Sequence, residues 1–110
     1  MKHSVSHEQG VAIVSPQGKL DSFSAKGFEE ELLGLIRAGG RKLIIDCAQL
    51  DYVSSAGLRI FYLVAHHLQE AGGKIVLCGV SPEVKRVFDI VDLSSEFLIV
   101  PGRADAMRQF

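Results

Sequence analysis

Net charge, cysteine and long apolar runs are all scarce in this chain of 110 residues. The 12 Lys and Arg residues and the 13 Asp and Glu residues leave a formal net charge of −1 at pH 7, which argues against a protein that binds nucleic acid by neutralising its phosphates. The longest apolar run covers residues 60–65, whereas a membrane-spanning helix needs about 20 apolar residues. No apolar run of about 7–15 residues follows the basic start, as it would in a secretory signal. The sequence therefore predicts a cytoplasmic protein with no membrane span and no direct contact with nucleic acid.

The few cysteines and histidines do not form a recognisable ligand set. Cys47 and Cys78 lie 31 positions apart, which fits neither a CxxC motif nor a zinc site. Each ends an apolar run, so both are interpreted as buried thiols without a redox role. His66 and His67 are adjacent and diverge by about 100° on a helix, and no carboxylate or cysteine completes a set. The sequence thus predicts neither a metal nor a cofactor.

Length and hydrophobic periodicity predict one domain over residues 1–110. The expected strands are residues 10–15, 19–20, 43–47, 74–78 and 97–100, and the expected helices are residues 25–36, 56–71, 82–91 and 102–110. The order β-β-α-β-α-β-α-β-α predicts an α/β fold in which parallel strands are joined through helices. Function in such sheets lies outside the carboxyl ends of the strands, which here means residues 21–22, 51–55 and 79–81.

One residue breaks the amphipathic pattern of the helix expected at residues 56–71. At 100° per residue, Leu63 falls among polar side chains beside Arg59 and His67, while Tyr62 falls on the apolar side. A single exposed leucine is common and needs no function. Alternatively, Leu63 and its two polar neighbours belong to a partner-binding surface.

Two serines begin this helix, in the sequence Ser54-Ser55-Ala56-Gly57. One hydroxyl is enough for a helix N-cap, so the second is available for another role. Gly57 falls in the first turn, where glycine costs about 1 kcal/mol relative to alanine. We interpret it as a point where another chain or a phosphate approaches the backbone. A phosphoserine here would lie at the positive end of the helix, which is worth about 0.3–1 kcal/mol when exposed.

The same segment partly matches the G-x-S-x-G turn of serine hydrolases, with Ser55 as the nucleophile. Val53 stands where that turn needs its first glycine, and the last histidine, His67, lies in the middle of a helix. The sequence therefore does not predict an enzyme.

The stretch LDYVSSAGLR, residues 50–59, resembles the signature of STAS-domain anti-sigma factor antagonists. The likeness extends over nearly the whole chain. It includes Gly18-Lys19-Leu20-Asp21, Ile45-Asp46, Gly72-Gly73-Lys74 and Ser81-Pro82-Glu83-Val84. The resemblance implies a STAS fold, with a single mixed β-sheet of roughly four to five strands and about four helices.

The resemblance also implies a partner-switching function. Proteins of this family bind a serine-kinase anti-sigma factor in their unphosphorylated form and so release a sigma factor. The kinase phosphorylates one serine of the antagonist, which then dissociates, and a PP2C-type phosphatase restores it. Alignment on Gly57-Leu58 places this serine at Ser55, while Ser54 stands at a position that is often Asp in the family and remains an alternative. The acidic residue after the first hairpin corresponds to Asp21, and a monomer is expected when the protein is free.

The predicted site thus comprises the phosphoacceptor and the residues that flank it. They are Ser55, with Asp21, Ser22, Ser54, Ala56, Gly57, Arg59 and Leu63 as partner-binding or flanking residues. The alternative function is a STAS module that is never phosphorylated, such as a scaffold or interaction subunit of a sensory complex or of lipid-transport machinery. In that case Ser55 would serve only as a helix cap.

Overall fold

The computed structural model describes residues 2–92 and 94–110. Within them the chain alternates between strands and helices, and the predicted α/β class is confirmed. The elements in order are β1 (Lys2–Glu8), β2 (Val11–Leu20), α1 (Ala25–Arg37), β3 (Lys42–Asp46), β4 (Leu50–Val53), α2 (Ser55–Glu70), β5 (Lys74–Cys78), α3 (Pro82–Ile90), the 3-10 turn η1 (Ser94–Glu96), β6 (Leu98–Val100) and α4 (Arg103–Met107).

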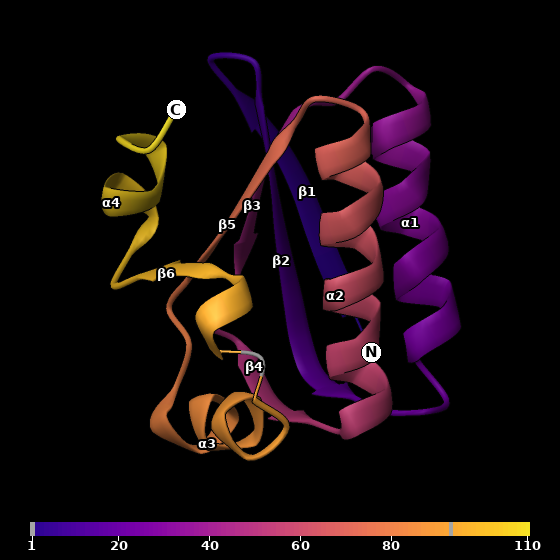
Figure 1. Cartoon of the computed structure of the whole chain (residues 1–110), viewed down its shortest axis with the longest axis vertical. Helices are drawn as coiled ribbons and strands as arrows, with labels where there is room; N and C mark the ends of the chain where they lie inside the picture. Colours follow the sequence, from indigo (N-terminus) through magenta and orange to yellow (C-terminus); the bar gives the residue numbers. More distant parts are fainter. Residues whose placement is uncertain (1, 93) are drawn as a thin grey trace.

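The strands form one mixed sheet with the order β1-β2-β3-β5-β6 (Figure 1). β1 and β2 are an antiparallel hairpin, whereas β2, β3, β5 and β6 pair in parallel. β4 lies off this path and pairs in parallel with the last part of β2. The long strand β2 therefore has two parallel partners in addition to β1, since residues 12–14 pair with β3 and residues 18–20 pair with β4.

The described residues contain two strands that the hydrophobic pattern did not indicate, so the sheet has six strands where four to five were expected. β1 is an edge strand with exposed side chains apart from half-buried Val5, so it lacks an apolar run. β4 has only four residues and falls in a segment expected to be a loop. The strands expected at residues 10–15 and 19–20 form one continuous strand, β2. Pro16 does not interrupt it, because this residue lies between the part of β2 that pairs with β3 and the part that pairs with β4.

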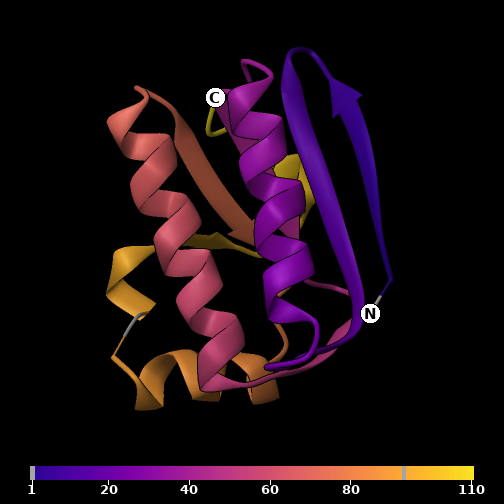
Figure 2. The ribbon, with the colours of Figure 1, turned by 90° about the vertical axis from the view of Figure 1, so that its right-hand side faces the viewer.

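Helices cover both faces of the sheet. In Figure 1, α1 and α2 lie on one side of the sheet and α4 lies on the other, and Figure 2 shows α1 and α2 side by side. β3 is buried on both faces, as its continuous apolar sequence predicted: Ile45 belongs to the core under α1 and α2, and Ile44 belongs to the core under α4.

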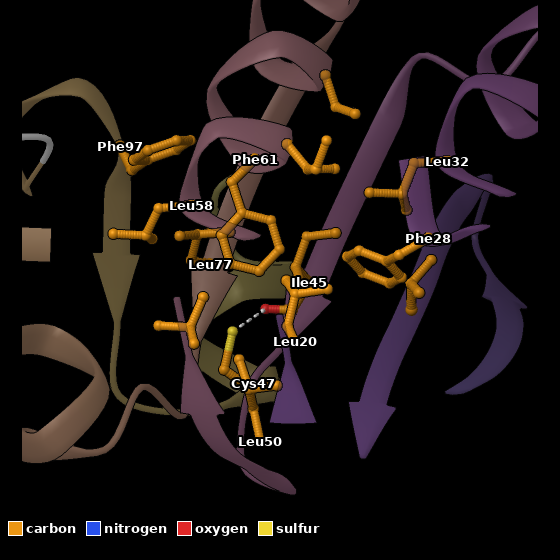
Figure 3. Close-up of a cluster of buried hydrophobic side chains, with 14 of the residues drawn as sticks. Leu20, Phe28, Leu32, Ile45, Cys47, Leu50, Leu58, Phe61, Leu77 and Phe97 are labelled. Carbon is orange, nitrogen blue, oxygen red and sulfur yellow. Dashed lines mark hydrogen bonds between the residues drawn. The ribbon is translucent and has the colours of Figure 1, made fainter. Parts of the chain in front are cut away.

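The larger core contains aromatic rings from three helices, Phe28 of α1, Phe61 of α2 and Phe88 of α3. Figure 3 shows the Phe28 and Phe61 rings among the buried side chains of this core. The ring centroids of Phe28 and Phe61 are 5.9 Å apart, and those of Phe61 and Phe88 are 6.0 Å apart. Both separations lie in the range that aromatic pairs favour. These contacts fix α1, α2 and α3 relative to one another. They therefore also fix the relative positions of the first turns of α1 and α2.

The cysteines are buried thiols, as predicted. Cys47 belongs to the core under α2 and Cys78 to the core under α4, so they lie on opposite faces of the sheet. Burial raises the pKa of both thiols, that of Cys78 to about 11, and the Asp46 carboxylate adds to the effect. Both side chains therefore stay protonated at neutral pH.

Candidate functional site

The carboxyl ends of β2 and β4 bring two of the predicted functional segments together. Leu20 pairs with Val53 at the ends of these strands, and the Ser54 N–H donates a hydrogen bond of 2.9 Å to the Leu20 carbonyl oxygen. Asp21 directly follows Leu20, and Ser55 directly follows Ser54. The turn at residues 21–22 and the serine pair are thus neighbours, as the topology predicted. The third segment, residues 79–81, begins near Asp46, since Gly79 lies against its carboxylate.

The two serines have different environments. Ser54 is the N-cap of α2, with φ −87° and ψ 168°, and its Oγ accepts a hydrogen bond of 3.1 Å from the Gly57 N–H. Ser55 is the first residue of the helix, and its side chain is exposed. Its hydroxyl makes no hydrogen bond to any other residue that the structure describes. One serine therefore caps the helix, and the other leaves its hydroxyl open to a second molecule.

Gly57 is explained by packing inside the molecule, which corrects the interpretation drawn from the sequence. The residue is buried, and a Cβ atom here would lie 2.7 Å from Leu20 Cγ, 2.7 Å from the Leu20 carbonyl oxygen and 3.0 Å from Val53 Cγ2. The first turn of α2 thus lies directly on the ends of β2 and β4. The close approach that requires glycine is made by these strands and not by a phosphate or another chain, while the neighbouring Ala56 is exposed.

The Asp21 carboxylate orders the turn between β2 and α1. Its Oδ1 accepts hydrogen bonds from the Phe23 N–H at 3.0 Å and the Ser24 N–H at 3.2 Å, and the Ser24 hydroxyl lies 3.3 Å away. In return, the Asp21 N–H donates to Ser24 Oγ at 3.0 Å. The hydrogen bond from the Ser24 backbone, followed by that from Phe23, holds the pKa of Asp21 below its ordinary value despite some desolvation. Asp21 is therefore an anion at neutral pH, and Ser22 beside it is exposed.

Ser55 lies at the rim of an open groove of about 300 Å³ whose lining is mostly apolar. The groove is lined by Ser55, Arg59 and Tyr62 of α2 and by Val91, which follows α3. Arg59 is exposed, and its guanidinium forms no ion pair within residues 2–92 and 94–110. An exposed hydroxyl, an apolar depression and a cation are thus placed together along one side of α2.

Leu63 is half-buried and does not line this groove, so the surface predicted from Arg59, Leu63 and His67 stays a prediction. The apolar part of the groove is formed by Tyr62 and Val91. The sequence pattern places Tyr62 on the apolar side of its helix, yet its side chain is 36% exposed, and Val91, the last residue of the helix expected at residues 82–91, is 37% exposed. Tyr62 lies at one end of the apolar arc of α2, where the helix face borders solvent, and Val91 directly follows the last residue of α3.

In the described part of the chain, no three His, Cys, Asp or Glu side chains are grouped so that they could hold a metal ion. None of the helices within residues 2–92 and 94–110 is long and apolar enough to cross a membrane.

Comparison with known proteins gives the family. The model of the STAS domain matches residues 3–106, so this chain belongs to the STAS domain family. Over 110 residues it is 37% identical to BtrV of Bordetella bronchiseptica, whose proposed role is that of an anti-sigma factor antagonist; the match covers the whole chain and 95% of BtrV. It is also 29% identical over 76 residues to the anti-sigma-B factor antagonist of Staphylococcus epidermidis, covering 69% of this chain and 70% of that protein.

A solved structure shows the same fold. The Bacillus cell fate determinant SpoIIAA in its phosphorylated form superimposes with a TM-score of 0.76 at 16% identity, covering 98% of each chain. The resemblance seen in the signature at residues 50–59 and the STAS fold that it implied are thereby confirmed.

Proposed function

We propose that this protein is an anti-sigma factor antagonist that binds a serine-kinase anti-sigma factor while Ser55 is unmodified, and that phosphorylation of Ser55 ends the binding. The observation that carries the proposal is the open hydroxyl of Ser55 at the rim of the groove, next to a serine that caps the helix. The relatives named as anti-sigma factor antagonists support the same function. A sigma factor held by the kinase is released when this protein takes its place.

Ser55 can accept a phosphate without disturbing the fold. Its side chain is exposed and takes no part in the cap, since Ser54 alone receives the Gly57 N–H. The added charge of about −1.5 to −2 lies at the positive end of α2, where an anion is stabilised. The free, phosphorylated protein therefore keeps its structure, and the modification acts on binding alone.

In the complex the same charge is unfavourable. A partner that covers the apolar groove excludes water from Ser55, and a phosphate there must lose its hydration or meet a surface fitted to a neutral hydroxyl. Asp21 adds a second anion near the serine. Asp21 directly follows Leu20 and Ser55 directly follows Ser54, and the Ser54 N–H is hydrogen-bonded to the Leu20 carbonyl oxygen. Phosphorylation thus favours the free state and disfavours the bound state.

The exposure of Ser55 also suits reversal of the switch. A PP2C-type phosphatase must bring its active site to the phosphate, and a phosphate at the first residue of α2 extends into solvent. In this account the protein is a monomer when free, it is a substrate of two enzymes, and it has no catalytic group of its own.

The test is to incubate the protein with the purified anti-sigma factor kinase and ATP and to locate the phosphate by mass spectrometry. The wild type and Ser54→Ala should each carry one phosphate on Ser55, and Ser55→Ala should carry none. Undiminished phosphorylation of Ser55→Ala would overturn the assignment. If no variant is phosphorylated and Ser55→Glu binds the partner as tightly as the wild type, the protein is a scaffold module without the switch.

A further inference from the structure

Phe23 is the most exposed large apolar side chain of the described residues, at 96%. It lies in the turn between β2 and α1, and it packs against no core cluster. An aromatic ring in water gains free energy when another surface covers it. Phe23 contributes little to the fold, so its contribution to stability does not explain its presence.

The turn holds the backbone of Phe23 in place. The Phe23 N–H donates to Asp21 Oδ1 at 3.0 Å, and the Ser24 N–H donates to the same oxygen at 3.2 Å. The Ser24 hydroxyl also lies 3.1 Å from the Lys19 carbonyl oxygen, which ties the turn to the end of β2. A ring on an ordered turn loses little conformational entropy when a partner binds it.

Most of the exposed apolar side chains belong to segments at the end of the molecule where α2 begins with Ser55. Among the described residues six large apolar side chains are exposed, and five of them belong to segments that border this end of the molecule. These five are Phe23 after β2, Tyr52 of β4, Tyr62 of α2, and Ile90 and Val91 at the end of α3. In Figures 1 and 2, the start of α2, the turn before α1 and α3 all lie at the same end of the molecule. The sixth, Leu98, belongs to the edge strand β6. A concentration of this kind marks a protein-binding surface.

The charged residues beside Phe23 indicate what chemistry a partner's surface needs in order to cover the ring. Phe23 borders an open hollow that is also lined by Lys19 and Asp21. The hydrogen bonds that the Asp21 carboxylate accepts within the turn all go to Oδ1, and Oδ2 has no donor among the residues of the described ranges. A partner must therefore offer an apolar pocket for the ring and charged side chains at the rim of that pocket, with a cation facing Asp21.

We propose that Phe23 is the anchor residue of the interface with the anti-sigma factor kinase. Its ring enters an apolar pocket of the kinase whose charged rim faces Lys19 and Asp21, while Ser55 reaches the active site of the kinase. The inference rests on the proposed function, because it takes the kinase as the partner. It separates the two tasks of the surface, since Phe23 provides affinity and Ser55 provides the switch.

The test measures the dissociation constant for the purified kinase by isothermal titration calorimetry, with Phe23→Ala, Phe23→Leu, Leu98→Ala and Ser55→Glu beside the wild type. Phe23→Ala should bind about 30-fold more weakly, which corresponds to about 2 kcal/mol. Phe23→Leu, which keeps an apolar side chain, should lose less. Leu98→Ala removes an exposed apolar side chain from β6 and should bind as the wild type does. Thermal unfolding of Phe23→Ala should match the wild type, because the ring is exposed.

Kinetics provide a second readout that a purely structural role would not change. Phosphorylation of Phe23→Ala by the same kinase should show a raised KM and an unchanged kcat, because the ring binds the kinase but takes no part in phosphoryl transfer. An unchanged dissociation constant and KM would overturn the anchor role while leaving the switch at Ser55 intact. Weak binding of Phe23→Ala together with wild-type binding of Ser55→Glu would support the anchor and overturn the switch. Failure of the wild type to bind the kinase would overturn both.

Discussion

Substitution of Gly57 by alanine tests how α2 is placed on the ends of β2 and β4. The added Cβ would lie 2.7 Å from both Leu20 Cγ and the Leu20 carbonyl oxygen. Inserting a carbon into a packed site costs about 1–3 kcal/mol, and the upper part of that range applies because the carbonyl oxygen belongs to the backbone. That oxygen also accepts the Ser54 N–H, so moving it weakens the start of α2.

Gly57→Ala is expected to lower both the free energy of unfolding and the Tm. A steric cost of about 3 kcal/mol, offset by about 1 kcal/mol of helix propensity, leaves Gly57→Ala about 2 kcal/mol less stable. For a domain of this size that lowers the Tm by about 8 °C. Urea denaturation followed by circular dichroism measures the free energy of unfolding directly.

Two glycines of α1 provide the matched control. A Cβ at Gly27 or Gly34 would meet no atom within 4 Å, so alanine there should stabilise the protein by about 0.5–1 kcal/mol. The opposite signs at equally helical positions separate packing from propensity. If Gly57→Ala is as stable as the wild type or more stable, the packing explanation for this glycine is refuted.

Three further predictions concern the groups around the site and the sheet. Ser54→Ala removes the cap from the Gly57 N–H and should lower the free energy of unfolding by about 1 kcal/mol, whereas Ser55→Ala should change it by less than about 0.5 kcal/mol; thermal melts of the pair distinguish the two serines. The pKa of Asp21 is lowered in the folded state, so its stabilising contribution is complete above the unfolded pKa near 3.8 and is lost as the pH falls through the folded pKa. In urea titrations between pH 5 and pH 2, Asp21→Asn should therefore lose less stability than the wild type. Parallel curves of unfolding free energy against pH for the two proteins would contradict this. Arg103 Nε lies 2.6 Å from Asp46 Oδ2, and the Asp46 side chain is only 12% exposed. Arg103→Ala leaves that carboxylate without its cation and should lower the free energy of unfolding by about 1–2 kcal/mol, a reduced value because Arg103 itself is half exposed. An unchanged urea midpoint would show that the pair contributes nothing to stability.

The alternation of helices and strands could be predicted from the sequence because burial on a regular element leaves a periodic pattern. The apolar run of β3 and the helical spacing of Phe28 and Leu32 are examples. β1 could not be predicted in this way, because an exposed edge strand is held by backbone hydrogen bonds to β2 and has no need for apolar side chains. β4 is too short for a pattern, and its place is set by pairing with β2.

The candidate site was predictable where residue type and position act locally. A serine pair before an apolar helical stretch predicts a cap and one additional hydroxyl, and the structure assigns the cap to Ser54. The groove was not predictable, because Val91, which directly follows α3, is placed beside residues of α2 only by tertiary packing. The role of Gly57 depends in the same way on Leu20, which lies far away in the sequence.

The decisive measurement is the affinity of the purified anti-sigma factor kinase for the protein with and without phosphate on Ser55. The phosphorylated protein is expected to bind at least about 100-fold more weakly, which corresponds to about 2.8 kcal/mol, while its amide NMR spectrum changes only near the start of α2. Equal dissociation constants for the two forms would contradict the claim that the charge on Ser55 controls the partnership.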